Sequence, residues 1–90
     1  MNKLREIVRQ PLFEQELLQL EFDPVRADEF TEGVEFVLSR NPRYGTNVAK
    51  NVWFIPMWRP AEGKSLNLYY AFDSDHVYFL SLQKAREEVE

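Results

Sequence analysis

The most constraining feature of this chain is the strict alternation of apolar side chains along residues 66–72. The apolar positions fall on every second residue: Leu66, Leu68, Tyr70 and Phe72. This period of two is typical of a half-buried β-strand and excludes an amphipathic helix. Asp73-Ser74-Asp75 follows with residue types that favour turns, and residues 76–82 (HVYFLSL) have the composition of a further strand. We therefore expect a β-hairpin over residues 66–82.

The N-terminal part of the chain has helical periodicity instead. Apolar residues recur at helical spacing after Pro11, namely Phe13, Leu17 and Leu20. Asp23-Pro24 joins a preferred N-cap to a preferred first helical residue, so one helix is expected to end near residue 22 and a second to begin here. The apolar stripe of the second helix is Ala27, Phe30, Val34, Val37 and Leu38. Asn41-Pro42 ends this helix, and Gly33 within it predicts a close approach to the first helix or to the sheet.

Three further segments complete the expected order of elements. Residues 3–10 (KLREIVRQ) are expected to form a short strand, and residues 42–51 (PRYGTNVAKN) a polar loop. Residues 52–58 (VWFIPMW) are apolar on both faces, as in a strand covered on two sides. Pro56 cannot donate a ladder hydrogen bond and belongs at an edge, a bulge or the end of its strand. The sequence thus predicts one α+β domain over residues 1–90, with two N-terminal helices packed on a small, mainly antiparallel sheet in the order β-α-α-β-β-β.

Composition excludes several classes of protein. The chain is 44% hydrophobic and 14% aromatic, which is too rich for a disordered segment. It has no cysteine, so disulfides and thiol chemistry are excluded, and its single histidine excludes a Cys/His zinc site. No apolar run approaches the length of a membrane span, and the charged N-terminus lacks the apolar segment of a secretory signal. A cytoplasmic protein without cofactor or metal is the expectation.

The net charge of −4 is unevenly distributed, because residues 1–40 carry nine acidic and five basic side chains. The chain lacks the basic excess of most nucleic-acid-binding proteins, so any polyanion-binding surface must be local. The acidic residues 23–35 are expected to be a solvated helix face. Trp53 and Tyr70 are expected in the core, whereas Trp58 beside Arg59 is the aromatic that a partner would contact.

No strong catalytic motif is present, and each candidate residue has a plainer explanation. His76, just after a turn, is more commonly structural or solvated than a general base. Basic residues flank the expected strand ends, and all are ordinary surface charges unless a substrate phosphate meets them: Arg43, Arg59, Lys64 and Lys84. Cleavage of RNA without metal also requires an acid and a base, for which a tyrosine, His76 or a carboxylate are the available groups.

The chain resembles the RelE/ParE superfamily of bacterial toxins over almost its whole length. Three parts of the chain are similar to the family's pattern. They are the opening EIVRQPLFEQELLQL, the end of the second helix at LSRNP followed by Gly45 and Val52-Trp53, and the closing segments LYYAF and VYFLSLQK. Gly63-Lys64-Ser65 before one strand and Lys84 after the last resemble the HigB-like branch. The resemblance implies the toxin, or a toxin-derived component, of a type II toxin–antitoxin module, similar to ribosome-dependent mRNA interferases, which are metal-independent endoribonucleases.

In that interpretation five residues form the catalytic site. Arg59, Lys64 and Lys84 would contact phosphate, and Tyr69 or His76 would carry the proton, with Trp58 as a stacking surface. Two departures from the family pattern predict weakened or lost cleavage. Asn67 lies at or next to a position where family members usually carry arginine, and the chain is acidic where ribosome-directed members are basic. The alternative is a non-catalytic module of the same fold, either a ParE-like topoisomerase inhibitor or a degenerate antitoxin-binding protein.

The resemblance also implies a protein partner. Several large apolar residues exceed what a chain of this size can bury, namely Leu12, Phe13, Trp53 and Trp58. Toxins of this family are wrapped by an antitoxin segment that folds on binding, so we expect an antitoxin as partner. A homodimer is the alternative use of the same surface. The ribosome with its mRNA would be the target, and no membrane is involved.

Overall fold

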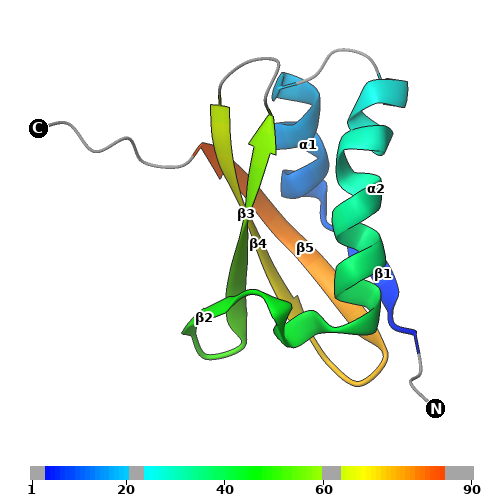
Figure 1. Cartoon of the computed structure of the whole chain (residues 1–90), viewed down its shortest axis with the longest axis vertical. Helices are drawn as coiled ribbons and strands as arrows, with labels where there is room; N and C mark the ends of the chain where they lie inside the picture. The colour runs from blue at the N-terminus through cyan, green and yellow to red at the C-terminus, as the bar shows by residue number, and fades with distance from the viewer. Residues whose placement is uncertain (1–3, 21–23, 60–63, 85–90) are drawn as a thin grey trace, which may run out of the picture.

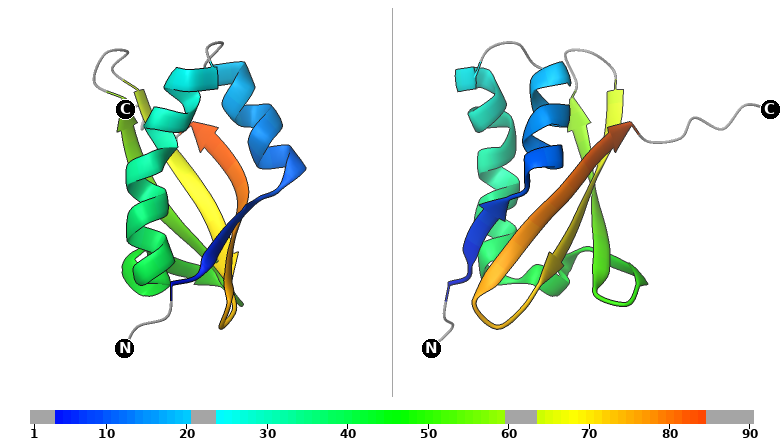
Figure 2. Two further views of the ribbon diagram at one scale, coloured as in Figure 1. Left: turned by 90° about the vertical axis from the view of Figure 1, so that its right-hand side faces the viewer. Right: turned by 180° about the vertical axis from the view of Figure 1, so that it is seen from behind.

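The computed structural model describes residues 4–20, 24–59 and 64–84. Two α-helices, one short 3-10 helix and five strands follow one another (Figure 1): β1 Glu6–Arg9, α1 Pro11–Leu20, α2 Pro24–Arg40, η1 Pro42–Tyr44, β2 Thr46–Ala49, β3 Val52–Arg59, β4 Lys64–Phe72 and β5 His76–Lys84. Both helices lie on one side of the sheet, which Figure 2 shows most clearly in its left view. The expected α+β architecture is confirmed.

The five strands form one sheet in the order β1-β5-β4-β3-β2. The first and last strands are neighbours, since β1 runs parallel to β5 with Ile7 opposite Val77. The other three pairings are antiparallel, so the sheet is mainly antiparallel, as predicted. The predicted hairpin is present as β4 and β5, each of which extends two residues beyond the predicted limits.

One segment differs from its prediction. Residues 42–51 are not simply a loop, because they contain η1 and the short edge strand β2. Every residue of β2 is exposed, so it has no buried face to produce the alternation by which a strand is recognised. The segments that join residue 59 to residue 64 and that follow residue 84 lie outside the described residues.

The core lies between the helices and the central strands. Its buried side chains come from both helices and from β4 and β5: Phe13, Leu17, Leu38, Leu66, Leu68, Tyr70, Val77, Phe79 and Leu82. The rings of Phe13 and Phe79 meet edge to face, with centroids 5.2 Å apart. Trp53, Ile55 and Met57 of β3 pack against this core only partly buried. The prediction that residues 52–58 are covered on two sides is therefore wrong, because both helices lie over one face only.

Tyr70 fixes the turn between α2 and β2. Its buried hydroxyl donates a hydrogen bond to the Pro42 carbonyl at 2.6 Å and accepts one from the Gly45 N–H at 3.0 Å. Burial raises the pKa of this phenol, although the hydrogen bond from Gly45 opposes that shift. Gly45 is required by this close approach, since a Cβ there would lie 2.4 Å from the Phe54 carbonyl oxygen.

Gly33 has a different environment from the one predicted. A Cβ added at this position would meet nothing within 4 Å, so α2 approaches neither α1 nor the sheet here. The predicted close packing at Gly33 is wrong. No packing reason for a glycine exists at this exposed position within the described part of the chain.

Pro56 lies in the middle of β3, where the sheet has a free edge. The β2 pairing ends at Thr46 opposite Phe54, so from Ile55 onward β3 has no described neighbour on that side. The missing N–H of Pro56 therefore removes no hydrogen bond from the ladder with β2. The prediction that Pro56 occupies an edge is confirmed.

Arg9 joins β1 to α2. Its guanidinium donates to Glu35 Oε2 at 3.0 Å, to Asp28 Oδ1 at 3.0 Å and to Thr31 Oγ1 at 2.7 Å. Two acidic side chains of the predicted solvated face are thus ion-paired, although Glu29 and Glu32 are exposed as expected. The contact orients α2 against the edge strand β1.

Candidate functional site

Strand pairing brings three basic residues to one end of the sheet. Arg59 is the register partner of Lys64 at the end of the β3–β4 ladder. Lys84 is the partner of Leu66, two residues further along β4. The side chains of Arg59, Lys64 and Trp58 lie outside the described part of the structure. The backbone alone nevertheless gathers Arg59, Lys64 and Lys84 at one place, which we call the cationic end.

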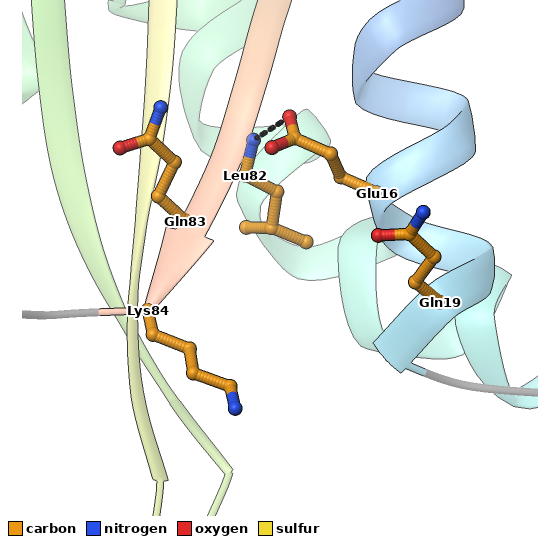
Figure 3. Close-up of a pocket in the computed structure, with 5 residues that line it drawn as sticks. All are labelled: Glu16, Gln19, Leu82, Gln83 and Lys84. Atoms are coloured by element: carbon orange, nitrogen blue, oxygen red, sulfur yellow. Dashed lines mark hydrogen bonds between the residues drawn. The ribbon is translucent and has the colours of Figure 1, made fainter.

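An open pocket of about 330 Å³ lies at this end, between α1 and β5 (Figure 3). It is lined by Glu16, Gln19, Leu82, Gln83 and Lys84. Glu16 closes the inner wall, because its Oε1 accepts hydrogen bonds from Ser81 Oγ at 2.7 Å and from the Leu82 N–H at 3.1 Å. Glu16 thereby accepts the N–H of Leu82 at the edge of β5, beyond Phe79, where the pairing with β1 ends.

Tyr69 lies on the face of the sheet that the helices leave uncovered. Residues of β4 alternate between the two faces, and Tyr69 has the opposite parity to the buried Leu68 and Tyr70. Its ring lies 6.0 Å from the ring of Phe54, its register partner. Asn67 has the same parity and lies between Pro56 and Gln83. The uncovered face therefore presents an aromatic pair and an amide but no described cation in this row.

His76 begins β5 and belongs to the turn that connects it to β4. Asp73 Oδ1 accepts hydrogen bonds from the backbone N–H groups of Asp75 and His76, at 2.8 Å and 2.7 Å, and its Oδ2 accepts one from the Tyr78 hydroxyl at 2.9 Å. The two backbone donors lower the pKa of Asp73 to about 2. The same carboxylate raises the pKa of the Tyr78 phenol.

The imidazole of His76 lies between two carboxylates. Nδ1 is 3.4 Å from Asp73 Oδ1, and Nε2 is 3.8 Å from Glu6 Oε2. Nδ1 is nevertheless buried without a hydrogen-bond partner in the described structure. Both carboxylate oxygens of Asp73 already accept hydrogen bonds from the turn and from Tyr78. The contacts around His76 are therefore those of a structural turn and not of an oriented catalytic base.

The five predicted catalytic residues do not gather in one site. His76 begins and Lys84 ends the nine-residue strand β5, so roughly 26 Å of extended chain separates them. Tyr69 has the opposite parity along β4 to Leu66, the partner of Lys84, and therefore lies on the other face. The structure brings together the three basic residues and separates both proton carriers from Lys84.

The exposed apolar residues are only partly those predicted. Leu12 is 54% exposed, but Phe13 is fully buried in the core, so its predicted exposure is wrong. Trp53 is half-buried, with its ring 5.4 Å from Phe72. Other large apolar side chains are exposed instead: Leu4, Leu18, Val25, Phe36, Tyr44 and Val48. Helical spacing had correctly grouped Phe13 with Leu17, since both are buried and the neighbouring Leu12 is exposed, so the error lies in counting Phe13 among the residues too many to bury.

The fold has a counterpart among solved structures. The chain matches a chain of the toxin–antitoxin complex RelBE2 from Mycobacterium tuberculosis with a TM-score of 0.66. The match covers 94% of this chain and 98% of that one, at 18% sequence identity. This protein has a RelE-like fold. The predicted superfamily fold is confirmed, and the assignment to the HigB-like branch stays a prediction.

Sequence comparisons add no relative. No protein-family model matches the chain, and no curated protein matches it. Within the described residues, no helix is long and apolar enough to cross a membrane. The likeness to the RelE-like fold is thus found through structure, at 18% sequence identity.

Two structural residues escaped the sequence analysis. Glu16 contacts Ser81 and Leu82, which lie 65 and 66 residues away in the chain, so no local signal could reveal it. Asp73 did carry a signal, since aspartate before a short turn commonly accepts backbone N–H bonds. The Asp73-Ser74-Asp75 sequence predicted the turn but not that its carboxylate would also bind Tyr78.

Proposed function

We propose that this protein is the toxin, or a toxin-derived component, of a type II toxin–antitoxin module. The observation that carries the proposal is the likeness of nearly the entire chain to a chain of a toxin–antitoxin complex. The match covers almost all of both chains, so the likeness concerns the whole fold and not one part of it. We place its action in the cytoplasm.

The partner that we propose is an antitoxin segment. Large apolar side chains are exposed on both helices, with Leu12 and Leu18 on α1 and Phe36 on α2. An apolar segment that folds on binding would cover them, which is how small toxins are held inactive. A homodimer through the same helices is the alternative occupant.

The proposed target is mRNA on the ribosome, with weak cleavage or none. Arg59, Lys64 and Lys84 would contact phosphate at the cationic end, as in the HigB-like branch. Both candidate proton carriers, Tyr69 and His76, are separated from Lys84. The carboxylate that lines the pocket with Lys84 is Glu16, and its Oε1 is held by hydrogen bonds from Ser81 and Leu82. Asn67 adds no charge to the uncovered face, and the loss of one charge-stabilising donor typically costs about 10²–10³ in rate.

The separation of the proton carriers from Lys84 also favours the second candidate, a non-catalytic module of the same fold. Such a protein would bind its antitoxin, or a topoisomerase as ParE-like members do, without cutting RNA. The two candidates share the partner and differ in the chemistry. They therefore require an experiment that reads cleavage directly.

The experiment induces the protein alone and maps mRNA 5′ ends on translating ribosomes. The unmodified protein is expected to give few codon-positioned cuts, and Asn67→Arg to give more, because a fixed positive charge returns to the uncovered face. Gln15→Arg, which adds the same charge on an exposed position of α1, is the matched control and is expected to change nothing. Abundant cuts by the unmodified protein would refute the weak-cleavage proposal.

A further inference from the structure

Three arginines from separate segments lie at the end of the molecule opposite Lys84. Arg5 precedes β1, Arg40 ends α2 and Arg43 lies in η1, and we call these three residues the arginine surface. The Arg5 N–H donates to the Ser39 carbonyl at 2.9 Å, which ties the approach to β1 to the end of α2. Figures 1 and 2 place the start of β1, the C-terminal end of α2 and η1 at the same end.

Each of these arginines is held against an aromatic ring. The guanidinium carbons of Arg5 and Arg43 both lie 5.7 Å from the centroid of Phe72, and that of Arg40 lies 3.5 Å from the centroid of Phe36. A guanidinium over a ring keeps its N–H groups available at its edge. Phe36 is 59% exposed, and Tyr44, next to Arg43, is 64% exposed. Two exposed aromatic side chains thus adjoin the cations of this surface.

The three guanidinium groups have no carboxylate partner within the described part of the chain. Arg5 Nε donates to the Asp73 carbonyl at 2.7 Å, and Arg40 donates to the Phe36 carbonyl at 3.0 Å. Arg43 has no hydrogen bond to a described residue. The chain has 15 acidic and 11 basic residues, so a shortage of carboxylates is not the reason that these arginines form no ion pair with a described residue. Arg9, by contrast, pairs with two carboxylates at once.

The nearest acidic side chain along the chain from Phe72 is turned away from this surface. The carboxylate of Asp73 accepts from two backbone N–H groups and from the Tyr78 hydroxyl. Tyr78 is the register partner of Ala71 and so has the opposite parity to Phe72. Asp73 therefore directs its carboxylate toward Tyr78, and Glu6, which follows Arg5, lies 3.8 Å from the His76 imidazole. The arginine surface keeps three guanidinium groups without an ion pair to a described carboxylate.

We propose that the arginine surface binds phosphate groups of an RNA strand, at a place distinct from the cationic end. Unpaired guanidinium groups bind phosphate through paired N–H donors, and binding releases counterions. Exposed aromatic rings and guanidinium planes between the cations offer stacking surfaces to unpaired bases, which favours RNA over an acidic protein segment. The surface would anchor RNA without cutting it, so the inference goes beyond the proposed function and holds even if the protein is not a toxin.

Fluorescence anisotropy with a labelled single-stranded RNA dodecamer tests the proposal on the full chain. Three phosphate contacts on a single strand give a slope of about −2 for log K against log salt concentration, or about 20-fold weaker binding at 200 mM than at 50 mM salt. The triple variant Arg5→Gln, Arg40→Gln, Arg43→Gln is expected to reduce the magnitude of this slope by about 2. Arg43→Gln alone, which breaks no described hydrogen bond, is expected to reduce the slope by about 0.7 without affecting folding.

Two controls decide where and what the protein binds. Lys50→Gln removes the same charge from the exposed β2–β3 turn, outside the arginine surface, and is expected to leave the slope unchanged, whereas a slope that falls only in this variant would overturn the proposal. An unlabelled polyglutamate peptide of equal charge is expected to compete weakly, because it offers no bases to stack. Equal competition would show that the surface recognises acidic protein instead. Absence of RNA binding by the unmodified protein at 50 mM salt would also refute the inference.

Discussion

The two glycines that the structure places in opposite environments give a paired test of the packing. Replacing Gly45 by alanine puts a Cβ 2.4 Å from the Phe54 carbonyl oxygen and 2.5 Å from the Tyr70 hydroxyl. The backbone oxygen cannot move without disturbing the β2–β3 pair, and the hydroxyl cannot move without breaking its hydrogen bonds to Gly45 and Pro42. Overpacking of this kind costs about 1–3 kcal/mol, and a lost buried hydrogen bond adds about 1 kcal/mol.

Gly33→Ala is the matched control with the opposite sign. No atom lies within 4 Å of the added Cβ, so only helix propensity acts, and α2 should gain up to about 1 kcal/mol. Thermal unfolding followed by circular dichroism should show Tm raised by about 4–8 °C for Gly33→Ala and lowered by about 10–20 °C for Gly45→Ala. An unchanged Tm for Gly45→Ala, or a lower Tm for Gly33→Ala, would refute this account of the two sites.

Three further predictions concern side chains that join elements. Arg9→Met should lower the free energy of unfolding by about 2 kcal/mol in urea titrations, because Glu35 and Thr31 lose their shared donor, and Arg9→Lys should restore only part of it, since an ammonium cannot reproduce the fork. Glu16→Ala should lower Tm and increase amide exchange at Leu82, whose N–H loses its acceptor, whereas Glu29→Ala on exposed α2 should change neither. Asp73 has its pKa lowered from 3.8 to about 2, so its contribution to stability is complete above pH 4 and is lost as the pH falls toward 2. Asp73→Asn should therefore differ from the unmodified protein at pH 6 and converge with it near pH 2.

The sequence predicted the elements that have a buried and an exposed face. The alternation of β4 reflects one-sided burial, which leaves a periodic pattern in the chain. The helix boundary at Asp23-Pro24 reflects instead the preference of these residue types for the start of a helix. β2 left no such pattern because all its residues are exposed. The parallel pairing of β1 with β5 joins residues about seventy positions apart, which local periodicity does not encode.

The candidate site was harder to predict than the fold. The sequence correctly indicated that basic residues flank strand ends, and pairing brings Arg59, Lys64 and Lys84 to one of them. The sequence could not show that Tyr69 lies on the opposite face of the sheet from Lys84, or that His76 lies at the opposite end of β5 from Lys84. Both positions depend on the register of the sheet. Tyr69 and His76 were therefore predicted as proton carriers from their residue types and the family resemblance, without their positions in the sheet.

The most direct test of the proposed toxin–antitoxin role is growth on induction, with and without the product of the neighbouring reading frame. We expect the protein alone to slow growth and the neighbouring product to bind it and restore growth, with exposed Leu12 and Phe36 buried in the complex. The double variant Leu12→Ser, Phe36→Ser should fold and lose that binding, while Glu29→Ala retains it. Growth unaffected by induction, together with no binding between the two products, would contradict the account.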